Sequence, residues 1–275
     1  MQSRVKSAGH DRRVRWVHTC SVIALCLSFA CHGQRSDAAP AGDTPLPASA
    51  ASAGFTTVLD AWLAFPSLAQ SSAPYSYLRA RPTAERVRIK RDDLFRELDD
   101  LRWRLEGNGY TKLVAALDQW KSRLAQLAVF REPGDWSPAS LMAQPLRNPP
   151  IGEVAAIGAC EVPDWVEIWS ADGVRRTPWR TGLTLSGLAK SDAMNVQGIK
   201  VASVVSPTGD VRRYGQAAFN KTDTALLPGA RVVLPLPLGG EAFPWIRNTI
   251  AEILAHAPSG ENCSEMRLAQ AGGVQ

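Results

Sequence analysis

Histidine is scarce in this sequence. There are four histidines, and three of them (His10, His18 and His32) precede the part of the chain expected to fold. A Ser-His-Asp or Cys-His nucleophile would therefore have to be built on His256. The chain also lacks a Gly-x-Ser-x-Gly motif, paired zinc-binding histidines, a phosphate-binding loop and a dinucleotide fingerprint. These absences argue against the corresponding enzyme classes.

Cysteine is scarce as well, with five residues in 275. Beyond Cys31 only Cys160 and Cys263 remain. Two cysteines lack the usual companions of a metal site, so neither a metal nor a cofactor is expected. In an oxidising compartment the two either pair, joining the C-terminal segment to the folded body, or stay free. The sequence leaves both alternatives open.

Positive charge is not in excess on the folded part of the chain. The net charge is +5, but residues 1–40 hold six of the 31 basic and two of the 26 acidic residues. The remainder is nearly neutral, and a nucleic-acid partner is not expected because such binding needs a basic footprint on the domain itself. The basic cluster from Arg79 to Arg91 could still meet an anionic glycan or a lipid head group.

Residues 1–33 have the pattern of an export signal. A basic region ends at Arg15, and the apolar run that follows is shorter than the about 20 residues a membrane-spanning helix needs. Cleavage either makes Cys31 a lipidated N-terminus or falls between Gly33 and Ala41, and an uncleaved anchor is a third alternative. Residues 34–54, rich in Ala, Pro and Ser, predict a flexible tether. The protein is therefore expected in the periplasm, where lipidated Cys31 would anchor it to the outer membrane.

Two apolar stripes in residues 55–147 predict a long antiparallel helical hairpin. The first helix starts at Thr83, and Gly107-Asn108-Gly109 ends it before the second begins. Both stripes have helical spacing, and so short a turn lets each helix bury the other's leucines. The stripe residues are Leu94, Leu98, Leu101 and Leu105, then Leu113, Leu117, Trp120, Leu124 and Leu127.

Residues 148–241 predict a small sheet that begins after a domain boundary near Asn148. Residues 165–179 read as a hairpin, and a short helix capped by Thr184 follows. Strands are then expected at 199–205, 211–214 and 231–234, with a turn at Pro207–Asp210. The order β-β-α-β-β-β is that of a β-grasp, which makes the predicted fold class α+β.

The C-terminal part predicts an amphipathic helix in residues 242–258, which Pro258 ends. Its apolar face must be buried either on the protein's own body or against a partner or membrane. Residues 259–275 show little periodicity and are expected to form a flexible tail.

Ordered phrases between roughly Val58 and Ala257 resemble known families. Ser206–Asp210 and Leu227–Val232 resemble the soluble-ligand-binding β-grasp of bacterial polysaccharide-export proteins. More narrowly, four phrases look like the GfcC/YjbG family of capsule and exopolysaccharide biosynthesis proteins: Asn148–Gly152, Trp165–Trp169, Phe219–Lys221 and Leu227–Gly229.

The resemblance implies a first β-grasp in residues 55–147, either reduced or with strands too weak to read, and a second β-grasp after it. It also implies a non-enzymatic periplasmic role in capsule or exopolysaccharide assembly and export. The expected partners are an acidic polysaccharide, an outer-membrane polysaccharide export protein, or both.

Arg131 lies seventeen residues before Asn148, a spacing that resembles that of an arginine facing a groove in GfcC-type proteins. There it would bind a carboxylate or phosphate through a two-bond fork, unless it is a structural arginine bonded to loop carbonyls. Trp136, Trp179 and Trp245, in loops or at element ends, are the tryptophans best placed to stack on sugar rings, and the first two are the candidate ligand-binding residues.

Two other functions stay open. Two carboxylates at a suitable distance would make a polysaccharide-modifying enzyme. Alternatively, assembly through the terminal helix would make the protein a structural subunit of the export channel. The candidate carboxylates are Glu153, Glu161, Asp164 and Glu167.

Overall fold

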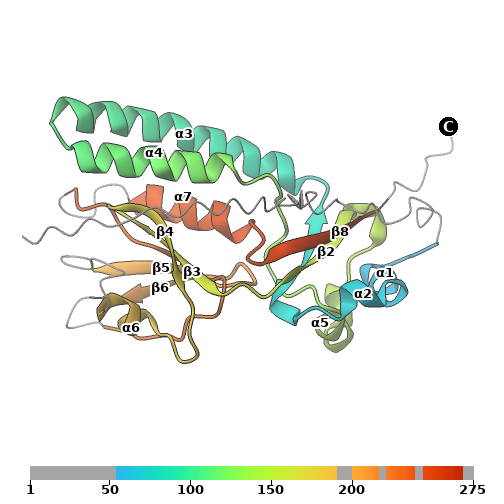
Figure 1. Ribbon diagram of the computed structural model, residues 1–275. Coiled ribbons are helices and arrows are strands. Elements are labelled where there is room, and N and C mark those ends of the chain that lie inside the picture. Colours follow the sequence, from blue (N-terminus) through green and yellow to red (C-terminus); the bar gives the residue numbers. More distant parts are fainter. Residues whose placement is uncertain (1–53, 191–199, 217–220, 239–243, 269–275) are drawn as a thin grey trace, which may run out of the picture. The chain divides into compact units, whose positions relative to one another are not determined.

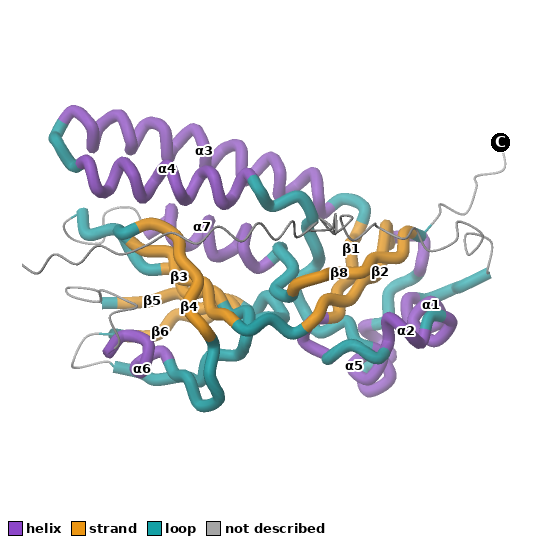
Figure 2. The backbone as a smooth tube through the Cα atoms, viewed as in Figure 1, coloured by secondary structure: helices purple, strands orange, loops and turns teal. Residues whose placement is uncertain are grey.

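The computed structural model describes residues 54–190, 200–216, 221–238 and 244–268. The predicted export signal, Cys31 and nearly all of the tether lie outside these ranges. The described residues form helices and two β-sheets, which confirms the α+β class (Figure 1). Figure 2 shows the two sets of strands as separate groups.

The smaller sheet has three antiparallel strands in the order β1-β2-β8. Three helices pack with it around a core that includes Trp62 and Ile157. The strands are β1 (Ser76–Ala80), β2 (Val154–Glu161) and β8 (Glu261–Arg267), and the helices are α1 (Val58–Ala64), α2 (Pro66–Ala69) and α5 (Pro138–Ala143). Short 3-10 turns lie at Ala73–Tyr75, Pro145–Arg147 and Ile151–Glu153.

The boundary predicted near Asn148 is wrong as a division between sheets. β2 follows it in sequence but pairs with β1, which comes from the supposed N-terminal region. The next sheet begins only at Trp165. The Pro-rich approach to Asn148 was misleading because it turns the chain within one sheet rather than between two. Of the expected reduced first β-grasp, the described residues of 55–147 supply the single strand β1.

The flexible tail predicted for residues 259–275 is also wrong over its first part. Glu261–Arg267 form β8, which pairs with β2, and Cys263 is disulfide-bonded to Cys160. Gly260 lets the chain before β8 pass close to Cys160, since a Cβ at position 260 would lie 2.2 Å from the Cys160 Cβ. β8 is mostly exposed, so it lacks the apolar alternation by which a strand is recognised. Residues 269–275 lie outside the described ranges.

The larger sheet has five strands in the order β4-β3-β7-β5-β6. β7 lies in the middle, parallel to β3 and antiparallel to β5, and the two edge strands pair as hairpins. The expected N-cap is present, because Thr184 Oγ1 accepts a hydrogen bond from Gly187 N–H. The elements are β3 (Trp165–Ser170), β4 (Gly173–Pro178), α6 (Leu185–Lys190), β5 (Val201–Val205), β6 (Val211–Gly215) and β7 (Arg231–Val233).

Alternate residues of the larger sheet enter two different cores. Ile168 and Val232 pack with α6 on one face. Trp169 and Val233 pack on the other face with α3 (Thr83–Gly107), α4 (Thr111–Ala125) and α7 (Pro244–Ala255). Figure 1 shows α7 between the α3–α4 pair and the sheet. The period-two alternation of the strands thus decides which side chains face the helices.

The helices on that face bury the predicted stripes except Leu127, which follows α4 and is partly buried. Arg102 of α3 pairs with Asp118 of α4 at 2.9 Å, and Lys121 of α4 bonds to Asp99 of α3. The apolar face of α7, including Ile250 and Leu254, is buried in the same core. The apolar face of this helix is therefore buried on the protein's own body, the first of the two alternatives. None of the helices in the described ranges is both long and apolar enough to cross a bilayer.

Loss of the disulfide is expected to destabilise the protein. Cys160 and Cys263 are 103 residues apart, so the bond restricts a large loop of the unfolded chain. Replacing both cysteines by serine should lower the free energy of unfolding by about 2–5 kcal/mol. Urea unfolding with and without a reductant measures this. The reductant should shift the midpoint of the wild type but not that of the variant; an unshifted wild type would contradict the assignment.

Candidate functional site: an arginine cluster around Glu167

Glu167 lies at the centre of β3 on the face that packs against the helices. It shares that face with Trp165 and Trp169 because side chains alternate along a strand. Its side chain is 1% exposed. In the sheet register its lateral neighbours are Arg176 of β4 and Arg231 of β7. Three adjacent strands therefore bring one carboxylate and two guanidinium groups together.

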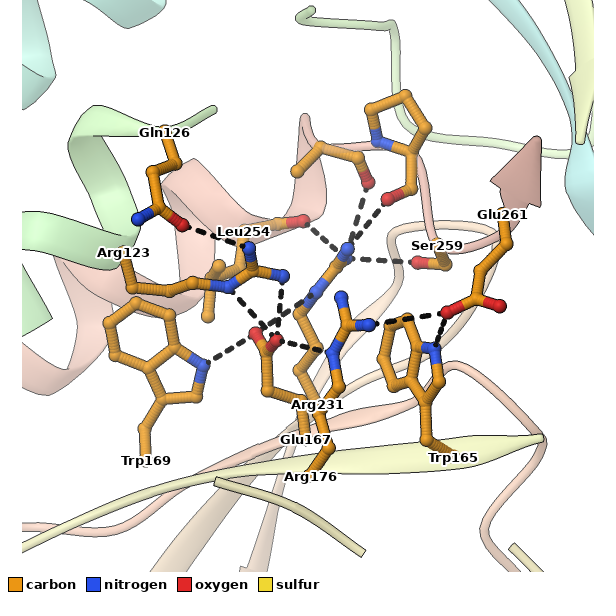
Figure 3. Close-up of polar contacts among 12 residues, drawn as sticks. Arg123, Gln126, Trp165, Glu167, Trp169, Arg176, Arg231, Leu254, Ser259 and Glu261 are labelled. Atoms are coloured by element: carbon orange, nitrogen blue, oxygen red, sulfur yellow. Dashed lines mark hydrogen bonds and ion pairs between the residues drawn. The ribbon is translucent and has the colours of Figure 1, made fainter. Parts of the chain in front are cut away.

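The Glu167 carboxylate receives hydrogen bonds from both sides (Figure 3). Arg123 of α4 donates to Oε2 through Nε at 3.0 Å and Nη2 at 2.8 Å, and Arg176 Nε donates to the same oxygen at 3.3 Å. Trp169 Nε1 donates to Oε1 at 3.0 Å, and Arg231 Nε lies 3.7 Å from Oε1. These contacts connect α4 to three strands through one buried charge.

Arg231 extends the cluster to the end of α7. Its Nη1 donates to Leu254 O at 3.2 Å and Ala257 O at 3.2 Å, and to Ser259 Oγ at 2.9 Å. Its Nη2 donates to Pro258 O at 2.6 Å. The last carbonyls of a helix have no partners within the helix, and a guanidinium at that end satisfies them. Arg231 therefore fixes the end of α7 over the sheet.

Arg176 faces outward from the cluster and is held by aromatic and acidic neighbours. Its guanidinium carbon lies 3.9 Å from the centre of the Trp165 ring, a cation–π contact. Its Nη1 donates to Glu261 Oε1 at 3.2 Å, and Trp165 Nε1 donates to the same oxygen at 2.6 Å. Glu261 belongs to β8, so the smaller sheet also contributes to the cluster.

The electrostatics of the cluster keep Glu167 ionised. Burial alone would raise its pKa, but the charges of Arg231 and Arg123 and the hydrogen bonds from Arg123 and Trp169 outweigh burial and lower it. For Arg231, burial lowers the pKa to about 10; Glu167 opposes this change, while the like charges of Arg123 and Arg176 add to it. The arginines thus repel one another around a single central carboxylate.

A hollow of about 270 Å³ opens beside this cluster. The side chain of Arg123 is 26% exposed and that of Arg176 is 43% exposed, so both reach solvent there. Buried Glu167 lies behind them. The other residues that line the hollow are Gln119, Ser122, Gln126, Val174 and Arg175. Part-exposed guanidinium groups at one hollow suit a carboxylate or phosphate, which accepts paired hydrogen bonds from arginine.

Arg131, by contrast, does not face an open groove. It is 1% exposed, and its Nη2 donates to the carbonyl of Pro207 in the turn before β6. Burial lowers its pKa to about 9; the nearby charge of Arg231 adds to this effect, whereas Asp210 opposes it. Its main chain exchanges hydrogen bonds with His256, N–H to O at 2.7 Å and O to Nδ1 at 2.8 Å. These contacts match the structural alternative, bonding to loop carbonyls.

The two candidate tryptophans lie apart from the arginine hollow and from its lining residues. Trp136 Nε1 donates to Glu132 O at 3.0 Å, and Arg147 lies 5.4 Å from its ring centre. Trp179 Nε1 donates to Leu226 O at 2.7 Å, and its ring packs on the core beside α6. Both rings are partly buried against the protein. The structure does not unite the three predicted residues in one site.

The basic cluster from Arg79 to Arg91 is largely neutralised by carboxylates. Arg79 pairs with Glu265 at 2.6 Å, and Arg86 with Glu132 at 3.5 Å. Lys90 pairs with Glu252 at 2.5 Å. This surface is therefore less suited to an anionic ligand than the hollow.

Of the four candidate carboxylates, Glu167 is the buried one. A general acid needs a raised pKa, whereas that of Glu167 is lowered. Glu161 is exposed and accepts a hydrogen bond from Asn262 at 2.7 Å. The described residues contain no group of three His, Cys, Asp or Glu side chains that could hold a metal ion.

Sequence reasoning missed Arg123, Arg176 and Arg231. A signal was present at Glu167, which lies between two tryptophans in a strand and must be buried with them. A buried carboxylate requires a cationic partner. Arg231, next to Val232 and Val233 in a short apolar strand, carries the same signal. The position of Arg123 depends on how α4 packs on the sheet, which no local pattern reveals.

A scan of protein-family models and a search of curated proteins both found no match to this chain. The likeness to the GfcC/YjbG family therefore stays a resemblance of short phrases.

Replacing Glu167 by Gln should destabilise the protein strongly. The amide keeps the shape but leaves the buried charge of Arg231 without its counter-ion, which costs about 3–5 kcal/mol. Urea unfolding measures the loss. Asp164→Asn, at an exposed position just before β3, is the matched control and should change the free energy of unfolding by less than about 0.5 kcal/mol.

We also expect the stability of Glu167→Gln to depend on pH differently from that of the wild type. The folded-state pKa of Glu167 lies below its ordinary value of 4.5, so its contribution to stability is present above that pH. It is lost as the pH falls through the lowered folded-state value. Unfolding measured at a series of pH values should therefore show a steeper acid loss in wild type than in Glu167→Gln. Parallel curves would contradict an ionised Glu167.

Proposed function

We propose that this protein is a non-enzymatic accessory protein of capsule or exopolysaccharide assembly and export, and that it binds an acidic polysaccharide at the hollow beside Glu167. One observation carries the proposal: Arg123 and Arg176 converge, part-exposed, over a carboxylate that is already saturated with donors. A second anion would relieve the repulsion among these arginines.

The size and shape of the hollow favour a single charged sugar unit of a longer chain. Pockets that enclose drug-sized molecules measure about 300–1,000 Å³, and this hollow is smaller and open to solvent. A polymer could therefore pass across it and place one acidic group against the arginines. Gln119, Ser122 and Gln126 offer polar side chains for neighbouring hydroxyls.

The proposal includes the finer fold assignment. We regard the five-stranded sheet with α6 as a β-grasp, and α3 with α4 as the antiparallel helical hairpin of the resembled family. The strand order supports this, since the last strand lies in the middle, parallel to the first. The contacts of Arg102 with Asp118 and of Lys121 with Asp99 support the hairpin.

A periplasmic location is part of the same proposal. The Cys160–Cys263 disulfide supports it because such bonds persist in oxidising compartments. The predicted export signal supports it as well, and lipidation of Cys31 would hold the protein at the outer membrane. An outer-membrane export protein is the proposed partner that receives the bound polymer.

Arg176→Gln should weaken binding of an acidic oligosaccharide. The change removes one of the two part-exposed guanidinium groups that contact Glu167 at the hollow, and loss of one charge-assisted contact should raise Kd about tenfold. Calorimetric titration of the purified mature protein with an oligosaccharide of uronic acids measures this.

The matched control is Arg213→Gln. Arg213 is an exposed arginine of β6, the opposite edge strand of the same sheet. Its replacement removes the same charge and should leave Kd within about twofold of wild type, because exposed charges at a distance are screened. Equal weakening by both variants would reduce the binding to general charge attraction. Cleavage of the oligosaccharide by wild type would favour the enzyme alternative.

A further inference from the structure

Glu261 already places a carboxylate on the arginine that lines the hollow. One of its oxygens, Oε1, accepts hydrogen bonds from Arg176 Nη1 at 3.2 Å and from Trp165 Nε1 at 2.6 Å (Figure 3). The Glu261 side chain is 44% exposed, so water and solutes can reach it. Arg176 is consequently shared between two carboxylates, with Glu167 on Nε and Glu261 on Nη1.

The position of Glu261 is fixed by the elements on both sides of it. Cys263, two residues later, is disulfide-bonded to Cys160, and Glu261 pairs in register with Glu161. Just before it, Ser259 accepts a hydrogen bond from buried Arg231, and Gly260 packs against Cys160. The main chain at Glu261 is therefore held close to Arg176, while its part-exposed side chain can still exchange with a ligand.

We propose that Glu261 is a specificity-determining residue beside the hollow, acting as an internal counter-ion that competes with the ligand's carboxylate for Arg176. This inference rests on the proposed function and names the ligand chemistry more closely. A carboxylate bound at the hollow meets the Arg176 guanidinium, whereas Trp165 is 5% exposed and neither it nor Glu261 lines the hollow. The same carboxylate projects from a sugar ring in a uronic acid, so the preferred ligand is a uronic-acid unit of the polymer.

Competition by Glu261 makes the hollow selective. A neutral sugar has no charge with which to displace a carboxylate from a guanidinium, so it gains nothing at Arg176. A ligand carboxylate exchanges one ion pair for another, and its net gain depends on the charge of Glu261. Removal of that charge should therefore strengthen binding of acidic ligands and leave neutral ones unaffected.

The test compares Glu261→Gln with wild type in calorimetric titrations with trigalacturonic acid and, as the neutral probe, maltotriose. Glutamine keeps the length of the side chain and an acceptor oxygen for Trp165 but removes the negative charge. We expect Kd for trigalacturonic acid to fall about two- to fivefold, the range for an exposed ion pair. No gain is expected for maltotriose. Structural damage would weaken binding, so a gain in affinity identifies competition.

Glu265→Gln is the matched control. Glu265 lies in the same strand and pairs with Arg79, which does not line the hollow. The Glu265→Gln substitution removes the same charge from β8, and the Kd for trigalacturonic acid should stay at the wild-type value. An equal gain in both variants would reduce the effect to net charge and overturn the role of Glu261.

A second readout follows the displacement itself. The indole N–H resonance of Trp165 should shift when trigalacturonic acid is added, since its acceptor Glu261 and the Arg176 guanidinium on its ring both respond to the ligand. Binding by wild type with an unchanged Kd in Glu261→Gln and an unmoved Trp165 resonance would overturn the inference and leave the proposed function standing. Absence of binding by every variant would instead overturn the proposed function.

Discussion

The buried ion cluster around Glu167 is the constraint on which the rest of the structure depends. A carboxylate that is 1% exposed loses nearly all its hydration, and it is tolerable only with charged donors close by. Each donor comes from a different element: Arg123 from α4, Arg176 from β4 and Arg231 from β7. Satisfying one charge therefore fixes how the helices lie on the sheet.

The same cluster accounts for both the stability and the proposed binding. The Nη1 and Nη2 groups of Arg231 donate to carbonyls at the end of α7 and to Ser259, so its role is structural. Arg123 and Arg176 also bond to Glu167 but keep part of their surface in solvent. Their bonds to Glu167 position them before a ligand arrives, which lowers the entropic cost of binding. Their surplus positive charge is what makes the hollow suitable for an anion.

Much of the fold could be predicted from the sequence, because local patterns determine it. The leucine stripes, the Thr184 cap and the alternation from Trp165 to Trp169 each report on a short segment. Two features could not be predicted in this way. β8 is a polar strand held by pairing and a disulfide, and β2 joins a sheet whose other strands are distant in sequence. Both depend on long-range pairing, which leaves little local signal.

The candidate site was less predictable for the same reason. Arg131 was singled out by its spacing, yet its side chain is buried and bonded to a turn. Glu167 was noted only as one carboxylate among several, although its place between two tryptophans implied buried partners. Its partners come from positions as distant as Arg123 and Arg231, so only the tertiary structure brings them together.

The most direct measurement of the central claim is the amount of polysaccharide on the cell surface and the amount retained inside, in cells with and without this gene. The proposed role predicts that surface polymer falls and internal polymer accumulates when the gene is removed. The wild-type gene should restore export, and the Arg176→Gln gene should restore it only in part at equal protein level. Unchanged amounts in both pools after removal of the gene would contradict a role in polysaccharide export.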